Sequence, residues 1–164
     1  ETTGEAEMMM TAMGQGNTLT NPYHMALITS AIANGGTLMK PYFVEKVTNY
    51  TGTEISKNVP KSYKRLMTSA EAAQLKEYMT AVVTEGTGML LSGQSYSAAG
   101  KTGTAEYSMV DGEKTHSWFM GFTNVDNPEL VICVIVEGAD GQDGAKAVPI
   151  AKQILDAYYY GSGW

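Results

Sequence analysis

A run of seven consecutive apolar residues, Leu130 to Val136, constrains the fold of this chain more than any other feature. A half-buried strand alternates apolar with polar residues, whereas this run has no polar position. It therefore predicts a strand with both faces buried under helices, in the interior of a sheet. The run is also the longest apolar stretch of the chain. A membrane-spanning helix needs about 20 such residues, so the sequence predicts no membrane segment.

Two further strand-like segments come before the apolar run, and the three together predict a small sheet. They cover residues 97–107, 115–123 and 129–137. The turns between them contain Asp111 with Gly112 and Asn127 with Pro128. Connections this short force neighbouring strands to run antiparallel, so we expect an antiparallel meander.

Helical patterns flank these strands in the sequence. The expected helices span about residues 21–34, 68–85 and 146–160. Asn21 followed by Pro22 is a typical start signal for the first helix. Thr68 and Glu71 have the spacing of a capping box at the start of the second.

Residues 42–58 favour extended structure, with Thr51 and Gly52 as the turn of a hairpin. The segment before residue 20 shows no clear pattern, so no element is predicted there. Helices and a hairpin beside an antiparallel meander give an α+β fold class, an antiparallel sheet flanked by helices. A length of 164 residues fits one domain or part of one.

The charge and cysteine content exclude several classes of protein. The net charge is −6, and a nucleic-acid-binding protein needs clustered positive charge. Cys133 is the only cysteine, so no disulfide framework can form within the chain. The spacing of His, Cys and Asp residues offers no metal site, and we expect no cofactor.

Residues 97–105 break a rule of strand composition. They read Ser-Ala-Ala-Gly-Lys-Thr-Gly-Thr-Ala, and such small residues are poor strand formers, although the meander requires a strand here. Small side chains let another backbone approach closely. The Lys101 ammonium and the hydroxyls of Thr102 and Thr104 would suit an extended peptide that carries a carboxylate.

The alternative for this segment is a tight contact with another element, with Lys101 extending into solvent. Alternation along a strand also sends Lys101 and Thr102 to opposite faces. A site shared by the two residues therefore requires an edge strand or a twisted strand.

Lys101, Thr102 and Gly103, followed by Thr-Ala-Glu, resemble the third motif of penicillin-binding protein transpeptidases. Three other segments resemble the same family in the same order: Gly14-Gln15-Gly16 with the helix after it, residues 116–122, and residues 147–154. The resemblance covers nearly the whole chain. It is most similar to the class B, monofunctional enzymes.

The resemblance implies a role for each residue of the motif. Lys101 would stabilise negative charge and support proton transfer. Thr102 would hydrogen-bond the carboxylate of the substrate, and Gly103 would keep the strand clear. The backbone N–H of Thr104 would form half of an oxyanion hole, in which the loss of one donor costs roughly 10²-fold in rate.

The nucleophile of the family is not found in the chain. Acyl transfer needs a serine with a nearby base, usually in the pattern Ser-x-x-Lys, which does not occur in these 164 residues. Ser62 is followed three places later by Arg65, which cannot act as a base. Ser56-Lys57-Asn58 imitates the Ser-x-Asn motif but lies on the wrong side of the Gly-Gln-Gly segment. We therefore expect residues 1–164 to be the C-terminal part of one transpeptidase domain, inactive by itself.

The resemblance also implies partners and a location. The substrate would be the D-Ala-D-Ala end of a peptidoglycan stem peptide, and β-lactam antibiotics would imitate it. Further expectations are the upstream half of the domain as a partner and a position at the extracytoplasmic face of a bacterial cell membrane. Two alternatives stay open: a non-catalytic peptide-binding or assembly module, and a β-lactam-sensing domain or serine β-lactamase relative with the same Lys-Thr-Gly strand.

Overall fold

The three predicted sheet strands form the centre of the molecule. The computed structural model describes residues 4–16, 18–109, 112–139 and 146–161. Strands β5 (Ala98–Met109), β6 (Gly112–Thr123) and β7 (Leu130–Val136) pair in that order, and both pairings are antiparallel. The predicted antiparallel meander is confirmed. Asp111, expected in its first turn, lies outside the described residues.

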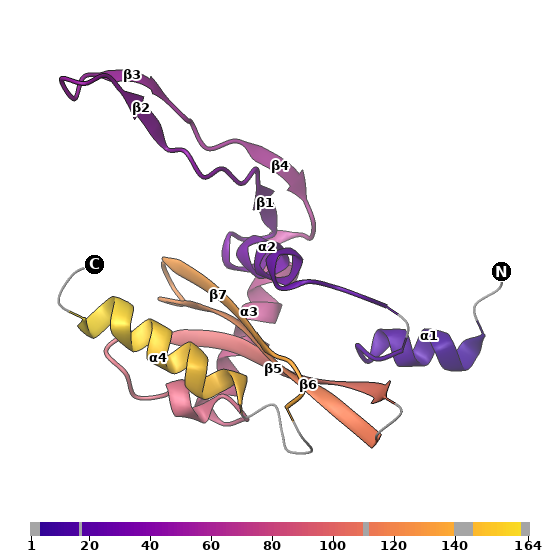
Figure 1. Cartoon of the computed structure of the whole chain (residues 1–164). Coiled ribbons are helices and arrows are strands. Elements are labelled where there is room, and N and C mark those ends of the chain that lie inside the picture. The colour runs from indigo at the N-terminus through magenta and orange to yellow at the C-terminus, as the bar shows by residue number, and fades with distance from the viewer. Residues whose placement is uncertain (1–3, 17, 110–111, 140–145, 162–164) are drawn as a thin grey trace.

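The predicted interior position of the apolar strand is wrong. β7 pairs only with β6 among the described strands, so it lies at one edge of the sheet. Its two faces are nevertheless covered, because α2 (Pro22–Ala33) and α4 (Ala147–Tyr160) both pack against β6 and β7 from opposite sides (Figure 1). An apolar run reports the burial of the two faces of a strand and carries no information about its hydrogen-bonding edges.

The three predicted helices are confirmed, and their caps explain where two of them start. The Asn21 side chain accepts a hydrogen bond from the His24 N–H at the start of α2, at 2.8 Å. In α3 (Ser69–Thr84) the Thr68 hydroxyl accepts from the Glu71 N–H, and the Glu71 carboxylate accepts from the Thr68 N–H. The hydrogen bonds that the Thr68 N–H and the Thr68 hydroxyl donate to the Glu71 carboxylate lower the pKa of Glu71. Helix η1 (Met89–Leu91) follows α3 and leads towards β5.

Two separate apolar cores lie on the two faces of the sheet. The core under α4 contains Phe119 and Leu155, and the core under α2 contains Phe122 and Met79. Phe119 is only 1% exposed, and its ring covers the paired glycines Gly100 and Gly121. A Cβ atom at Gly100 would lie 2.5 Å from Phe119 Cζ, so the ring can occupy this place only because both partners are glycine.

The predicted hairpin is confirmed and belongs to a longer arm. Strands β2 (Lys46–Thr48) and β3 (Glu54–Lys57) pair at its tip, and β1 (Thr37–Met39) pairs with β4 (Ser62–Arg65) at its base. The turn contains Gly52 with φ of +85°, a backbone conformation that favours glycine. The arm projects away from the sheet (Figure 1), and all residues of β2, β3 and β4 are exposed. The pairing of β1 with β4 was not predicted.

The expectation that no element precedes residue 20 is also wrong. Helix α1 (Glu5–Ala12) lies there, to one side of the sheet (Figure 1). None of its residues is buried. The helix has only eight residues, which is shorter than the window of about 11–18 residues in which helical periodicity can be recognised in a sequence. Within the described residues, no helix is long and apolar enough to cross a membrane.

Candidate active site at the free edge of β5

The outer edge of β5 is the side that faces away from β6. The backbone N–H and C=O groups of the even-numbered residues point to this edge. The Ser97 carbonyl accepts a hydrogen bond from the Asn124 N–H at 2.7 Å, so Ser97 faces the β6 side. Residues two apart along a strand point their N–H and C=O groups to the same side. Lys101 and Gly103 therefore bond towards β6, whereas Thr102 and Thr104 direct their backbone groups to the outer edge. No described strand pairs with that edge.

The Lys101 ammonium lies at this free edge. The side chain of Lys101 is exposed, and its Nζ donates a hydrogen bond to the Thr102 carbonyl at 2.6 Å. The side chain thus reaches around the strand to the edge, although its Cβ lies on the opposite face from that of Thr102. The sequence required an edge strand or a twisted strand for a shared site, and β5 is an edge strand among the described strands.

The Thr102 side chain is held by a residue that follows α3. Its hydroxyl shares a 2.6 Å hydrogen bond with the hydroxyl of Thr87. Thr102 is half-buried, whereas Lys101 and Thr104 are exposed. The contact fixes the Thr102 hydroxyl beside the strand, where it can donate to an acceptor or accept from a donor.

The two glycines of the segment have different surroundings. At Gly100 an added Cβ would collide with the Phe119 ring, as described above. At Gly103 it would meet only Trp118 Cβ, at 3.4 Å, which is ordinary contact. The chain itself therefore leaves room for a side chain at Gly103, and the predicted need for glycine there would come from a molecule bound against the strand.

The Thr104 N–H points to the same edge as the Lys101 ammonium. The N–H and the carbonyl of one strand residue point to the same side. The Thr104 carbonyl accepts a 3.1 Å hydrogen bond from the Gln15 side chain, which lies outside the sheet, so the Thr104 N–H points outwards as well. The Thr104 N–H is therefore open to an acceptor on this side, and its role as an oxyanion donor stays a prediction. The structure brings all four predicted site residues, Lys101 to Thr104, to one stretch of open edge.

Gln15 is the residue of this site that the sequence analysis missed. The sequence places it in a Gly-Gln-Gly segment that resembles the family and assigns it no role. The flanking Gly14 and Gly16 both have positive φ, +82° and +86°, and these turns direct the Gln15 side chain to a strand about 90 positions further along the chain. Two glycines around a single polar residue were the available signal.

The next three groups, whose pKa values are shifted, lie away from this edge. Burial, aided by a hydrogen bond to Asp156, raises the pKa of Tyr96, which packs under α4. A hydrogen bond from Lys152 lowers the pKa of Asp156. Burial raises the pKa of the Cys133 thiol in β7, which disfavours its thiolate form. Across the described part of the chain, no group of three His, Cys, Asp or Glu residues could hold a metal ion.

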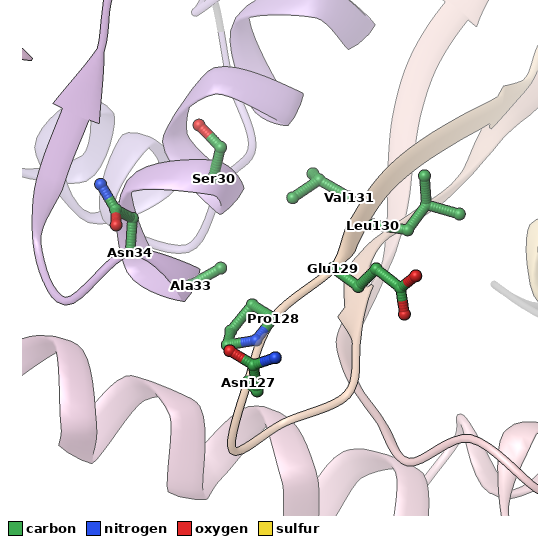
Figure 2. A pocket seen from close by; sticks show the side chains of 8 residues that line it. All are labelled: Ser30, Ala33, Asn34, Asn127, Pro128, Glu129, Leu130 and Val131. Atoms are coloured by element: carbon green, nitrogen blue, oxygen red, sulfur yellow. The ribbon is translucent and has the colours of Figure 1, made fainter. Parts of the chain in front are cut away.

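Two hollows in the surface also lie away from this edge. One, of about 270 Å³, lies between the end of α2 and the start of β7 (Figure 2), and is lined by Ser30, Ala33, Asn34 and residues 127–131. The other, of about 420 Å³, lies between the end of α3 and residues 91–98. Neither is lined by any residue from Lys101 to Thr104. The candidate site is an open strand edge, one wall that a second wall would complete.

This edge can bind and polarise a substrate but holds no activated nucleophile. The ammonium of Lys101, the Thr102 hydroxyl and the Thr104 N–H can together bind a carboxylate and a developing oxyanion. A serine in the pattern Ser-x-x-Lys is not present in the 164 residues.

Comparison with known proteins identifies relatives over nearly the whole chain. The model of a family described as penicillin binding protein transpeptidase domain matches residues 1–156. The chain is 34% identical over 162 residues to stage V sporulation protein D of Bacillus subtilis, covering 94% of this chain and 25% of the relative. It is 30% identical over 165 residues to the peptidoglycan D,D-transpeptidase MrdA of Acinetobacter baumannii, covering 93% of this chain and 24% of that protein.

A solved structure agrees with these relatives. The structure of penicillin-binding protein A from M. tuberculosis, an imipenem acyl-enzyme complex, superposes with a TM-score of 0.78 at 31% identity. The superposition covers 91% of this chain and 33% of the solved chain. The present chain therefore spans about a quarter of the length of the curated relatives and a third of the solved structure.

Proposed function

Because this chain belongs to the penicillin-binding protein transpeptidase domain family, we propose that it forms the Lys-Thr-Gly wall of a serine D-Ala-D-Ala transpeptidase active site. The whole enzyme would cross-link peptidoglycan stem peptides at the extracytoplasmic face of a bacterial cell membrane. It would also be acylated by β-lactam antibiotics. The observation that carries the proposal is the meeting of the Lys101 ammonium and the outward-facing Thr104 N–H on one unpaired strand edge.

The proposed reaction assigns one task to each group on this edge. A serine outside the 164 residues attacks the carbonyl carbon of the penultimate D-Ala, and the Thr104 N–H stabilises the negative oxygen that forms. The Thr102 hydroxyl binds the terminal carboxylate. Lys101 supplies positive charge beside both and supports transfer of the serine proton to the departing D-Ala amine. An amine of a second stem peptide then attacks the acyl carbon, the bond from this carbon to the serine oxygen breaks, and the amine proton returns to that oxygen.

Labelling with a fluorescent penicillin tests this function. The 164-residue chain alone is expected to stay unlabelled, since it lacks the nucleophile. The longer protein, with an upstream segment carrying Ser-x-x-Lys and then Ser-x-Asn, is expected to gain the mass of one penicillin. Labelling of the isolated chain would reveal a nucleophile within it. Upstream sequence without these motifs would instead favour the non-catalytic peptide-binding module.

A pair of glycine substitutions separates binding from folding. Gly103→Ala is expected to change the free energy of unfolding by less than about 1 kcal/mol. In the longer protein it should slow penicillin acylation by about tenfold or more, because the new methyl group keeps the ligand from the strand. Gly100→Ala should instead destabilise the fold by about 1–3 kcal/mol, since its Cβ collides with the Phe119 ring. Urea unfolding and acylation rates check both; equal effects of the two variants on stability would contradict the assignment.

A further inference from the structure

Gln15 occupies backbone positions of the β5 edge with its side-chain amide. Its Nε2 donates to the Thr104 carbonyl at 3.1 Å, and its Oε1 accepts from the Glu106 N–H at 3.3 Å. A residue on a parallel neighbouring strand makes the same two bonds, one to a carbonyl and one from the N–H two residues further on. The amide therefore imitates one residue of an added strand.

The chain holds this amide in place from the end of α1. The Gln15 N–H donates to the Met10 carbonyl at 2.8 Å, and the Gly14 N–H donates to the Thr11 carbonyl at 3.0 Å. Gln15 is half-buried, whereas every residue of α1 is exposed. These two hydrogen bonds show that α1 contributes to the structure without packing in a core, because its last turn fixes the backbone of Gln15.

The position of the amide divides the free edge into two parts. On the C-terminal side of the Thr104 N–H, the Thr104 carbonyl and the Glu106 N–H are both hydrogen-bonded to the Gln15 side chain. Before it, the N–H groups of Thr102 and Thr104 point outwards, and no hydrogen bond to either from the described loops or helices is found. A peptide that adds to this edge therefore meets two open N–H donors, at Thr102 and Thr104, before it reaches the groups that Gln15 already bonds.

We propose that Gln15 is a positioning residue that fixes the direction of the Thr104 N–H, because it bonds the Thr104 carbonyl and the Glu106 N–H that follow it on the strand. This inference rests on the proposed function, because it assigns that N–H to the oxyanion of the acyl-transfer step. Gln15 does not touch the reacting atoms. It acts by holding the peptide plane next to the one that carries the oxyanion donor.

Two variants and a matched control test this role in the longer, acylation-competent protein. Gln15→Ala removes both bonds. Gln15→Glu keeps the acceptor for the Glu106 N–H and loses the donor to Thr104. Gln74→Ala removes a glutamine whose side chain, within the described part of the chain, bonds only to Glu77 in the same helix.

Stopped-flow measurement with a penicillin separates the acylation rate constant from the non-covalent dissociation constant. Gln15→Ala and Gln15→Glu are expected to lower the rate constant by about 10²-fold, the cost of a 1 Å misplacement near the reacting centre. The dissociation constant should change by less than about twofold, and Gln74→Ala should leave both unchanged. A wild-type rate constant in Gln15→Ala, or a loss confined to binding, would overturn the role of Gln15 while leaving the proposed function intact.

Hydrogen exchange on the 164-residue chain gives a readout that does not depend on activity. The Glu106 amide should exchange at least about tenfold faster in Gln15→Ala than in the unmodified chain, whereas Gln15→Glu should retain its protection. Unchanged exchange at Glu106 in Gln15→Ala would overturn the proposal even if the longer protein proved not to bind penicillin at all. Failure of the wild-type longer protein to acylate would by contrast count against the proposed function alone.

Discussion

Replacing Lys101 with alanine in the longer protein is expected to lower the rate of penicillin acylation by about 10²–10⁴-fold, the usual range for a residue that assists proton transfer. The substitution removes the ammonium from the edge where the substrate carboxylate and the oxyanion would lie. The fold should be unaffected, because Lys101 is exposed and, among the described residues, its ammonium bonds only to the neighbouring Thr102 carbonyl. Its change in unfolding free energy should stay within about 0.5 kcal/mol.

A second substitution at this position separates charge from proton transfer. Lys101→Arg keeps the positive charge, but a guanidinium does not give up its proton. If Lys101 acts through its charge alone, the arginine variant should recover most of the acylation rate. Lys64→Ala, in the exposed strand β4, is the matched control and should acylate at the wild-type rate. An acylation rate in Lys101→Ala within threefold of the control would contradict the role given to Lys101.

Replacing Phe119 with alanine is expected to lower the free energy of unfolding of the chain by about 3–5 kcal/mol. The ring is 1% exposed, belongs to the core under α4 and covers the glycine pair Gly100 and Gly121. Its removal leaves a cavity directly over two residues that have no side chain to fill it. Because domains are stable by only about 5–15 kcal/mol, this variant should be close to unfolding at room temperature.

Urea unfolding followed by circular dichroism measures this loss. Phe43→Ala is the matched control, because Phe43 lies in the arm and is 97% exposed. Its unfolding free energy should change by no more than about 0.5 kcal/mol. A loss of less than 1 kcal/mol in Phe119→Ala would mean that the ring does not hold the sheet to α4.

The parts of the fold that were predicted correctly have local causes. The capping box at Thr68 and Glu71 marked the start of α3, and short turns fixed the antiparallel order of the three strands. The parts that were missed depend on neighbours far away in the sequence. The position of β7 at an edge is one example, since the run from Leu130 to Val136 reports only what covers its faces.

The candidate site was predicted in the same uneven way. The sequence pointed to residues 101–104 because small residues in a required strand are unusual. It also required an edge strand or a twisted strand for a site shared by Lys101 and Thr102. It did not predict that the Lys101 ammonium bends to the Thr102 carbonyl or that Thr87 contacts Thr102. Gln15 was missed because its partner strand lies 89 and 91 positions away, and no local pattern records such a contact.

The outer side of β7 has a consequence for how this chain behaves by itself. Its residues Leu130 to Val136 contain no charge and no proline, and among the described strands only β6 pairs with them. A strand of this composition with one bare side is a template on which foreign chains can add and begin fibril growth. A segment that pairs with the outer side of β7 would therefore extend the sheet. It would also prevent other chains from pairing there, so the same contact would reduce aggregation.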